Sequence, residues 1–341
     1  MGANARIGAR GRVLITGGLG FIGTHVADRF LANGCAVDLV DSMVAAVSDG
    51  RDYEVRPGVQ VYRQSIEDFI AANPTLEDYD LVVHAASLVG PAGILRHGGR
   101  LGVQMVTAAH AVVDACIAAG RRLIVFSSAE VYGRSGELAE ADAIVVPQPY
   151  NVRIEYAIAK TLIEAMTVNS LPRGLDAIVI RPFNVIGARQ SRANGFVAPT
   201  FVQQALAQRP LTVFGGGQQR RAFLSATDLS RFIVDYHEAA FSSDHLIFNV
   251  GNPYNTTTIY DFAERTRMLC QSKSPITLVD GKSIYGTLYE EAASVDKLPV
   301  IDAAADVGWQ PQVDLDSLIH ETIAFYTQHE DFLAHGLAER G

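Results

Sequence analysis

Short apolar runs alternate with longer stretches of helical periodicity through the first half of the chain. Runs rich in apolar and β-branched residues are typical of buried parallel strands. Six runs are predicted as strands: Arg12–Thr16, Ala36–Asp41, Val59–Arg63, Leu81–His84, Leu123–Ser127 and Ala177–Arg181. Helices are predicted between them, notably over Gly99–Ala119 and Glu155–Ser170. This alternation predicts right-handed βαβ units and therefore an α/β fold with a doubly wound parallel sheet.

The rhythm changes after Arg181, where loops rich in glycine, proline and polar residues mix with shorter elements. The pattern there predicts a turn at Gly215–Gly217, a helix over Thr227–Ala240 and a buried strand over Leu246–Val250. We therefore expect one doubly wound domain and a smaller C-terminal lobe interleaved with it. The expected boundaries are 11–181, completed by about 225–255, for the domain, and 182–224 with 256–330 for the lobe.

The first predicted strand runs into a glycine-rich turn that opens a helix. Gly18, Gly20 and Gly23 satisfy the G-x-G-x-x-G form, and Gly17, Gly20 and Gly23 satisfy a wider form. Glycines let the backbone close on a pyrophosphate, and the N-terminus of the helix presents N–H groups and a positive dipole to it. The strand, turn and helix together predict a Rossmann-type dinucleotide site whose loop also includes Phe21 and Ile22; a purely structural turn is the alternative.

An acidic residue ends the second predicted strand. Asp41 follows the apolar run Ala36–Val40, where a carboxylate can accept hydrogen bonds from the adenosine ribose hydroxyls. The same carboxylate would repel a 2′-phosphate, so the sequence favours NAD over NADP. The alternative is that Asp41 only caps the turn that follows it.

A tyrosine and a lysine are spaced four residues apart at the start of a predicted helix. Tyr156 and Lys160 share one helix face, so the ammonium can lie near the phenol and lower its pKa. A tyrosinate could then remove the proton of a substrate hydroxyl. The segment Ser127–Gly133 follows another apolar strand and ends at the same edge of the predicted sheet. The alternative is a surface tyrosine and lysine on an amphipathic helix.

Composition narrows the classes of partner. The formal net charge of the 341 residues is −9, with 48% hydrophobic and 19% charged residues, which is ordinary for a globular enzyme and unfavourable for a nucleic-acid-binding protein. Cys35, Cys116 and Cys270 form no C-x-x-C pair, and the nine histidines show no metal-ligand spacing. We therefore expect neither a disulfide framework nor a metal site. Because no apolar signal segment begins the chain and no stretch approaches ~18 uncharged apolar residues, we expect a cytoplasmic protein without a membrane span.

Several blocks, in order along the chain, resemble the extended short-chain dehydrogenase/reductase family, the NAD-dependent epimerases and dehydratases that act on nucleotide sugars. The blocks are Thr16–Gly23, His84–Ser87, Ser127–Gly133, Tyr156 with Lys160, Arg181–Gln190, Pro210–Phe223, Phe248–Asn252 and Val307–Pro311. The resemblance implies that Ser128 binds the reacting sugar hydroxyl, Tyr156 is the base and Lys160 holds the nicotinamide ribose. It also implies further residues for the cofactor (Ala85, Ala86, Ser87) and for the substrate (Asn184, Arg189, Val213, Arg221).

Within the family, the residues after Ser128 bear on the reaction. A 4,6-dehydratase has an Asp-Glu pair there, and Ala129 in place of the aspartate disfavours that chemistry. Glu130 is kept by UDP-glucuronate decarboxylases, which this chain also resembles at Arg153 and in the late segment Tyr285–Glu291. We expect decarboxylase-type chemistry on a UDP-sugar, with Glu130 as a catalytic residue. A nucleotide-sugar 4-epimerase is the alternative, and a non-catalytic NAD-binding scaffold is a remote one.

Two further features bear on that interpretation. The decarboxylases have Arg-Arg or His-Arg before a late proline, where this chain has Asp296-Lys297-Leu298-Pro299, and lysine does not reproduce an arginine fork. Family members also pair two helices per subunit into a four-helix bundle, so we expect a homodimer. The apolar stripes proposed for it are Leu101, Met105, Ala108, Val112 and Ala115 on one helix, and Ile158, Leu162, Ala165 and Met166 on the other. The alternative is that these stripes only pack on the sheet.

Overall fold

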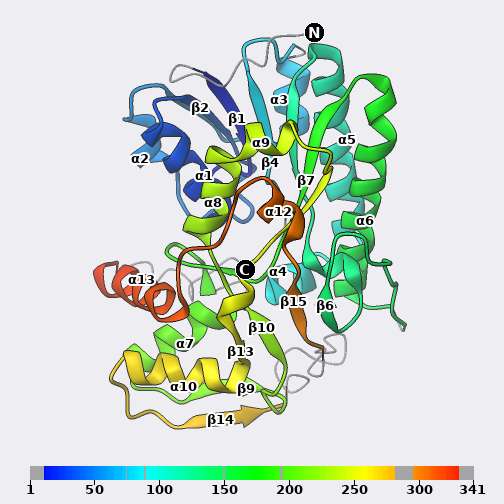
Figure 1. Cartoon of the computed structure of the whole chain (residues 1–341). Helices are drawn as coiled ribbons and strands as arrows, with labels where there is room; N and C mark the ends of the chain where they lie inside the picture. The colour runs from blue at the N-terminus through cyan, green and yellow to red at the C-terminus, as the bar shows by residue number, and fades with distance from the viewer. Residues whose placement is uncertain are drawn as a thin grey trace.

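A seven-stranded parallel sheet forms the upper part of the molecule (Figure 1). The computed structural model describes residues 11–329 except 74, 88–89, 149, 193–194 and 281–294. The strand order is β12-β7-β5-β4-β1-β2-β3, and every neighbouring pair is parallel. The strands are β1 (Arg12–Thr16), β2 (Ala36–Val40), β3 (Val59–Tyr62), β4 (Leu81–His84), β5 (Arg122–Phe126), β7 (Asp176–Pro182) and β12 (Ile247–Val250). The predicted doubly wound α/β fold is confirmed.

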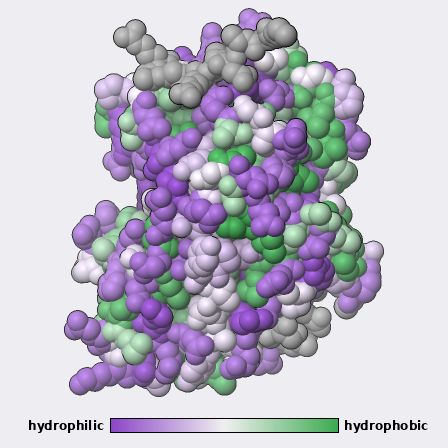
Figure 2. Space-filling view, in the orientation of Figure 1, coloured by the Kyte–Doolittle hydropathy of each residue, from purple (hydrophilic) through white to green (hydrophobic). Residues whose placement is uncertain are grey.

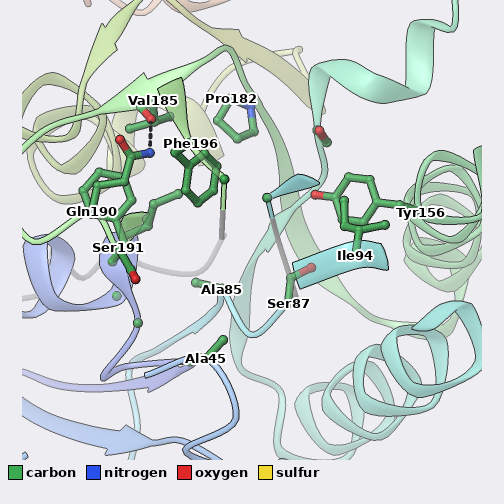
Figure 3. Close-up of a pocket in the computed structure, with 18 of the residues that line it drawn as sticks. Ala45, Ala85, Ser87, Ile94, Tyr156, Pro182, Val185, Gln190, Ser191 and Phe196 are labelled. Carbon is green, nitrogen blue, oxygen red and sulfur yellow. Dashed lines mark hydrogen bonds between the residues drawn. The ribbon is translucent and has the colours of Figure 1, made fainter. Parts of the chain in front are cut away.

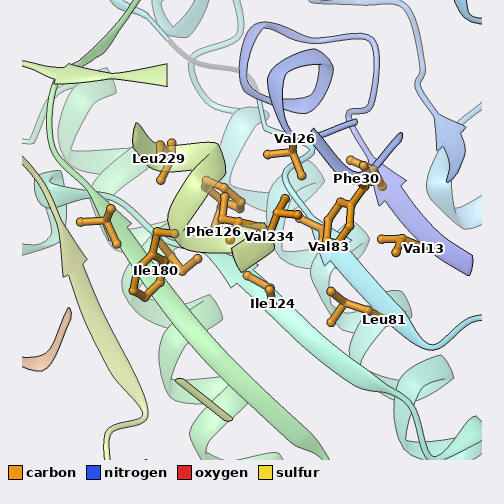
Figure 4. Packing of buried hydrophobic residues seen from close by; sticks show 14 of the residues in the cluster. Val13, Val26, Phe30, Leu81, Val83, Ile124, Phe126, Ile180, Leu229 and Val234 are labelled. Atoms are coloured by element: carbon orange, nitrogen blue, oxygen red, sulfur yellow. The ribbon is translucent and has the colours of Figure 1, made fainter. Parts of the chain in front are cut away.

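Helices cover both faces of this sheet because successive strand residues point to opposite sides. Val13 and Ile15 pack with α1 (Phe21–Ala32) and α8 (Ala226–Asp235), as Figure 4 shows for Val26, Phe30, Leu229 and Val234 around Leu81, Val83 and Ile124. Leu14, between them in sequence, packs into the opposite core with α3 (Ile66–Ala72), α5 (Leu101–Ala119) and α6 (Val152–Ser170). Both faces of the sheet are therefore buried.

Two predicted helices differ from the observed ones. α6 begins at Val152, earlier than predicted, because the Asn151 side chain accepts hydrogen bonds from the N–H groups of Arg153 and Ile154. The predicted helix over Thr227–Ala240 is two helices, α8 and α9 (His237–Phe241), with Tyr236 between them. The remaining short elements near the large sheet are α2 (Arg51–Glu54), α4 (Pro91–Arg96), η1 (Ala129–Tyr132), η2 (Leu171–Arg173), η4 (Pro253–Asn255) and α12 (Asp302–Asp306).

The smaller lobe lies below the sheet in Figure 1, and its described residues form short strands and the helices α7 (Val197–Leu206), α10 (Ile259–Leu269) and α13 (Leu315–Gln328). Its four-stranded sheet has the order β13-β10-β15-β6, and β9 pairs with β14 and β8 with β11. The strands are β6 (Gly136–Leu138), β8 (Val185–Ile186), β9 (Leu211–Phe214), β10 (Arg220–Ala222), β11 (Leu224–Ser225), β13 (Thr256–Thr258), β14 (Ile276–Val279) and β15 (Lys297–Pro299). Helices α7, α10 and α13 enclose a core that includes Phe201, Phe262 and Leu318.

Two segments cross the predicted division of the chain. β6 belongs to the predicted domain 11–181 but pairs with β15 of the lobe. Conversely, Ile301, Ala303, Ala304 and Trp309 pack in the core of the large sheet. The division itself stays a prediction, because the lobe range 256–330 includes 281–294 and residue 330, which lie outside the described residues.

Helix α5 corrects one expectation from the sequence. Leu101–Ala119 is long and apolar enough to cross a membrane, with a mean hydropathy of 1.5. In the fold this helix packs against α3 and α6, and Leu101, Met105 and Val112 lie in the core beside the sheet. A buried core helix of a globular protein passes the same test of length and composition.

Candidate active site

A cavity of about 990 Å³ lies where the carboxyl ends of the large sheet's strands face the smaller lobe. Ligands of open α/β sheets bind at this edge, and the volume is at the upper end of the ~300–1,000 Å³ common for ligand pockets. Most predicted site residues line it: Gly17, Gly20, Phe21, Ile22, Gly23, Asp41, Ala85, Ala86, Ser87, Ser128, Glu130, Tyr156, Asn184 and Arg221. Figure 3 shows residues from distant segments converging there.

The glycine loop leaves no room for side chains. Gly17 has a φ of +66°, and a Cβ there would lie 2.7 Å from the Cα of Ala86. A Cβ on Gly23 would lie 2.1 Å from the carbonyl oxygen of Gly17. Gly20 precedes the first residue of α1, whose first turn carries no acidic residue. The positive end of the helix dipole is therefore uncompensated within its first turn, which fits the pyrophosphate of a dinucleotide.

Asp41 both caps a turn and borders the cavity. Its carboxylate accepts hydrogen bonds from the N–H groups of Leu19 (3.1 Å) and Met43 (2.8 Å). Burial raises the pKa of Asp41, and these backbone hydrogen bonds oppose that rise. The turn-capping alternative is thus present in the structure. It does not exclude the predicted contact with a ribose, because Asp41 also lines the cavity.

Tyr156 is brought together with two serine hydroxyls. Its phenol and the Ser87 side chain point into the same part of the cavity (Figure 3), and Ser128 lines that cavity too. Burial raises the pKa of Tyr156 to about 12, and hydrogen bonding with Ser128 and Ser87 acts in the opposite direction. These contacts come from the ends of β4 and β5 and from the first turns of α6. They surround a hydroxyl that can exchange a proton with a bound substrate.

Lys160 is buried beside Tyr156 and does not line the cavity. Its Nζ donates a hydrogen bond to the carbonyl oxygen of Phe126 at 2.7 Å and lies 5.9 Å from the centre of the Tyr156 ring. Burial lowers the pKa of Lys160 to about 7, and the charge of Glu164 opposes this. The expectation that Lys160 lowers the pKa of Tyr156 is therefore not met in this structure, because burial of the phenol dominates.

Glu130 is held by two cations. The segment Ala129–Tyr132 is a short 3₁₀ helix, and the N–H of Glu130 donates to the Oγ of Ser128 at 3.2 Å. Arg153 Nη2 lies 3.2 Å from Glu130 Oε2, and the Nζ of Lys297 forms a second ion pair with Oε1. Burial acts against ionisation, but the charges of Lys297 and Arg153 outweigh it and hold the pKa of Glu130 well below its usual range.

Two predicted substrate residues occupy other positions. Arg189 does not line the cavity, because its Nη1 lies 2.7 Å from the Asp28 carboxylate and 3.2 Å from the Tyr53 hydroxyl. Val213 is fully buried in the core of the lobe, and its neighbours Thr212 and Phe214 line the cavity instead. Strand alternation explains the second difference, since adjacent residues face opposite sides.

The lobe supplies several polar groups that the sequence interpretation did not single out. Arg192 lines the cavity in place of Arg189. Gln190 and Gln219 are also part of the lining, and the side-chain oxygen of each is buried with no hydrogen-bond partner among the described residues. Figure 3 shows the amide nitrogen of Gln190 bonded to the carbonyl of Val185, at 2.9 Å. Buried polar atoms are rarely left without a partner, so both oxygens are candidate acceptors for a ligand.

Two predicted substrate residues do face the cavity. Asn184 adopts a φ of +41°, and its side-chain nitrogen donates to the carbonyl of Ala222 at 3.1 Å. Arg221 donates to the carbonyls of Arg220 and Val295 and borders the same space. The late segment Tyr285–Glu291 lies outside the described residues. Among the residues that are described, no group of His, Cys, Asp and Glu is arranged to hold a metal.

The chain belongs to the NAD dependent epimerase/dehydratase family, whose model matches residues 13–251. This assignment agrees with the glycine loop, the Tyr156 site and the seven-stranded sheet. The protein is an enzyme, and NAD is its cofactor.

Curated relatives resemble nearly the whole chain. A UDP-N-acetyl-alpha-D-glucosaminuronate decarboxylase of Bacillus cytotoxicus is 26% identical over 94% of this chain and 99% of its own length. A UDP-glucuronic acid decarboxylase 1 of Danio rerio is 27% identical, covering 94% of this chain and 73% of its own length.

Solved structures confirm the fold. A UDP-glucose 4-epimerase of Thermotoga maritima has a TM-score of 0.79 at 23% identity, with 94% of this chain and 99% of that chain covered. A UDP-glucuronic acid 4-epimerase of Bacillus cereus, solved with NAD, has a TM-score of 0.76 at 21% identity, with 93% and 99% covered. At 21–23% identity, these two structures show that the fold is shared.

Proposed function

We propose that this chain modifies a nucleotide-diphosphate sugar by oxidising the C4 hydroxyl of the sugar to a ketone, and that its physiological substrate is a UDP-sugar. One observation carries the proposal: Tyr156, Ser87 and Ser128 converge on a cavity that also contains the glycine loop. The two relatives that match 94% of the chain are named for UDP-sugars, which supports the nucleotide.

The chain's own residues fit the cofactor. Gly17, Gly20 and the first turn of α1 would hold the pyrophosphate, and Asp41 the adenosine ribose. The nicotinamide ribose would fall to Lys160 only if its Nζ, which bonds the carbonyl of Phe126 here, turned toward the cavity. When bound, NAD accepts the two electrons removed from the sugar carbon.

Acid–base work falls to the groups around Tyr156. Ser128 would bind the C4 hydroxyl, and the ionised form of Tyr156, a tyrosinate, would take its proton. Asn184 and Arg221, which border the cavity from the lobe, would contact the diphosphate. The guanidinium of Arg221 would contribute more, because charged donors form the strongest hydrogen bonds to phosphate.

For the step after oxidation, we propose decarboxylation of a UDP-uronic acid. A C4 ketone makes a C5 carboxylate a leaving group. Glu130, with its pKa held low, is an ionised acceptor rather than an acid, which is unfavourable for the loss of water that a 4,6-dehydratase catalyses. Arg153 and Lys297 add positive charge on the same side of the cavity. A nucleotide-sugar 4-epimerase is the second candidate, since epimerisation needs no group beyond Tyr156 and Ser128.

The experiment is a panel of UDP-, dTDP-, GDP- and CDP-sugars, with neutral and uronic acid members, analysed by mass spectrometry. Loss of CO₂ supports the decarboxylase, and loss of water would contradict the argument from Glu130. An unchanged mass with inverted C4 would make the protein an epimerase. The absence of turnover on every sugar would leave the scaffold alternative.

We also propose a homodimer and a cytoplasmic location. The apolar residues Val103, Ile158 and Leu162 are 72%, 41% and 50% exposed on α5 and α6, which supports an interface there. The predicted α5 stripe is not part of that surface, because Leu101, Met105 and Val112 pack in the core. The three cysteines are free thiols, which supports a reducing compartment.

A further inference from the structure

A buried ion pair lies behind the wall of the cavity, on the helix that carries Tyr156. Glu164 follows Lys160 by one turn of α6. Its two carboxylate oxygens accept hydrogen bonds from Nε (2.8 Å) and Nη2 (2.7 Å) of Arg181 on β7. The two side chains are only 5% and 3% exposed. Burying two charges is costly, so a pair in this position needs either exceptional geometry or a task.

The same carboxylate bonds the segment that joins β5 to Ser128. The Ser127 hydroxyl donates a hydrogen bond to Oε1 of Glu164. One turn earlier on the helix, Lys160 donates to the carbonyl of Phe126. α6 therefore bonds both the last residue of β5, Phe126, and the residue after it, Ser127, just before Ser128.

We propose that Glu164 is a positioning residue of the catalytic site: it fixes Ser127, and with it Ser128, and it extends to higher pH the range in which Lys160 is charged beside Tyr156. This inference rests on the roles given to Ser128, Tyr156 and Lys160 in the proposed function. Glu164 itself does not border the cavity.

The charges around Lys160 support the electrostatic half of the proposal. Burial lowers the pKa of Lys160, and Glu164 is the charge that opposes this. His84 on β4 also faces Lys160, but burial and Lys160 lower its pKa to about 3, so it is neutral at pH 7. Tyr156 is a neutral phenol on the same helix.

Two more groups lie beyond Glu164. Arg181 is paired with that carboxylate and also donates to the hydroxyl of Tyr132 at 2.9 Å. Because Glu164 is the charge that raises the pKa of Lys160 against burial, its removal lets the ammonium lose its proton at a lower pH.

The first test measures the titration of Lys160 directly. The chain has four lysines, so ¹³C NMR of lysine-labelled protein gives few signals, and Lys160→Met assigns the relevant one. In Glu164→Gln we expect its midpoint to fall by about 1 pH unit or more, the effect of losing a close opposite charge. The alkaline limb of the pH–activity profile should move to lower pH by the same amount. An unchanged midpoint would overturn the proposal.

A second variant distinguishes the effect of the Glu164 charge on Lys160 from its effect on the stability of the fold. Glu164→Gln leaves Arg181 buried without its carboxylate, which lowers stability. The double variant Glu164→Gln/Arg181→Met removes both charges and should regain stability. We expect the Lys160 midpoint to stay low in it; a midpoint and turnover restored to those of the wild type would mean that Glu164 only supports the fold.

A matched control uses another buried ion pair. Asp228 and Arg231 lie 3.0 Å apart on α8, with side chains 1% and 11% exposed. Asp228→Asn should lower the melting temperature without moving the Lys160 midpoint. The titration needs no substrate, so its outcome can be told apart from a failure of the sugar panel. If the Lys160 midpoint falls as expected in Glu164→Gln but the wild type turns over no sugar of the panel, the proposed function is rejected and the role of Glu164 toward Lys160 is retained.

Discussion

The ammonium of Lys297 forms an ion pair with the carboxylate of Glu130, and Arg153 approaches the same carboxylate from α6. Lys297 lies on β15 directly opposite Arg221 of β10, whereas Glu130 follows the end of β5. Asp296, the residue before it, pairs with Arg220 at 2.8 Å. The departure from the arginine pair of the resembling decarboxylases thus leaves Glu130 with two positive partners. Its ionised state depends on a strand from the smaller lobe.

Glu130→Gln tests the task of this carboxylate. If the enzyme is a decarboxylase, C4 oxidation should persist while the step at C5 slows, because the fixed charge of Glu130 and its pairs with Arg153 and Lys297 are lost beside that carbon. A 4-epimerase should change only modestly. Rapid-quench mass spectrometry distinguishes the two, and loss of the oxidation itself would return Glu130 to a structural role.

Lys297→Met removes one of the two cations and should raise the pKa of Glu130 toward its ordinary range. Because Glu130 is proposed to act ionised, the acid limb of kcat/KM should move to higher pH, with less change above neutrality. The measurement is a pH–rate profile, and Lys273→Met, on an exposed lysine, is the control. Identical acid limbs in Lys297→Met and wild type would contradict the electrostatic role.

Tyr156→Phe removes the proposed base and keeps the ring. Turnover should fall by about 10²–10⁴, while NAD binding measured by calorimetry stays close to that of the wild type. Full activity in this variant would reject the mechanism.

Asp41→Ala removes the acceptor proposed for the adenosine ribose. The variant should bind NAD more weakly and discriminate less against NADP, since the charge that repels a 2′-phosphate is gone. Because Asp41 also accepts from Leu19 and Met43, Asp41→Asn serves as the companion that keeps one acceptor oxygen. Equal affinity of the wild type for both cofactors would show that the assignment is wrong.

The exposed apolar face of α6 provides the test of the homodimer. Hydrophobic residues gather along the upper right edge in Figure 2, where Figure 1 places α5 and α6. Leu162→Glu should convert a dimer into a monomer by light scattering at micromolar concentration, whereas Met268→Glu, at an exposed site on α10, should not. A monomeric wild type would refute the interface.

His84 predicts acid sensitivity of the fold. It is buried against the hydroxyl of Thr16 at 2.8 Å, and burial lowers its pKa to about 3 from 6.5. The unfolded chain therefore takes up the proton first, and stability is lost as the pH falls below 6.5. Between pH 6.5 and 5 the contribution is about 2 kcal/mol. Urea unfolding should show a smaller pH dependence in His84→Asn, and no such change in the exposed-site variant His320→Asn.

Local signals in the sequence predicted the sheet and much of the site. Gly17, Asp41, Ser128 and Tyr156 each follow a strand or open a helix, and parallel strands bring their ends to one edge. Such residues could be placed without knowing any contact between distant segments. The strand periodicity similarly placed Leu14 and Val13 on opposite faces.

Contacts between distant segments were beyond that reasoning. Arg189 pairs with Asp28, and Lys297 with Glu130, through side chains whose partners no local pattern specifies. The pKa of Tyr156 depends on burial, which the helical spacing to Lys160 does not reveal. The break between α8 and α9 at Tyr236 was missed for a similar reason, because the helical spacing of apolar residues continues through it.

β15, which carries the Lys297 partner of Glu130, is synthesised after all seven strands of the large sheet. A growing chain that has passed residue 250 already contains all seven strands of the large sheet, Tyr156 and Ser128. Lys297 and the strand between β10 and β6 emerge later from the ribosome. All seven strands of the dinucleotide half can therefore leave the ribosome while Glu130 still lacks one counter-charge. Lys297 follows together with Ile301, Ala303 and Trp309, which also fill the core of the large sheet.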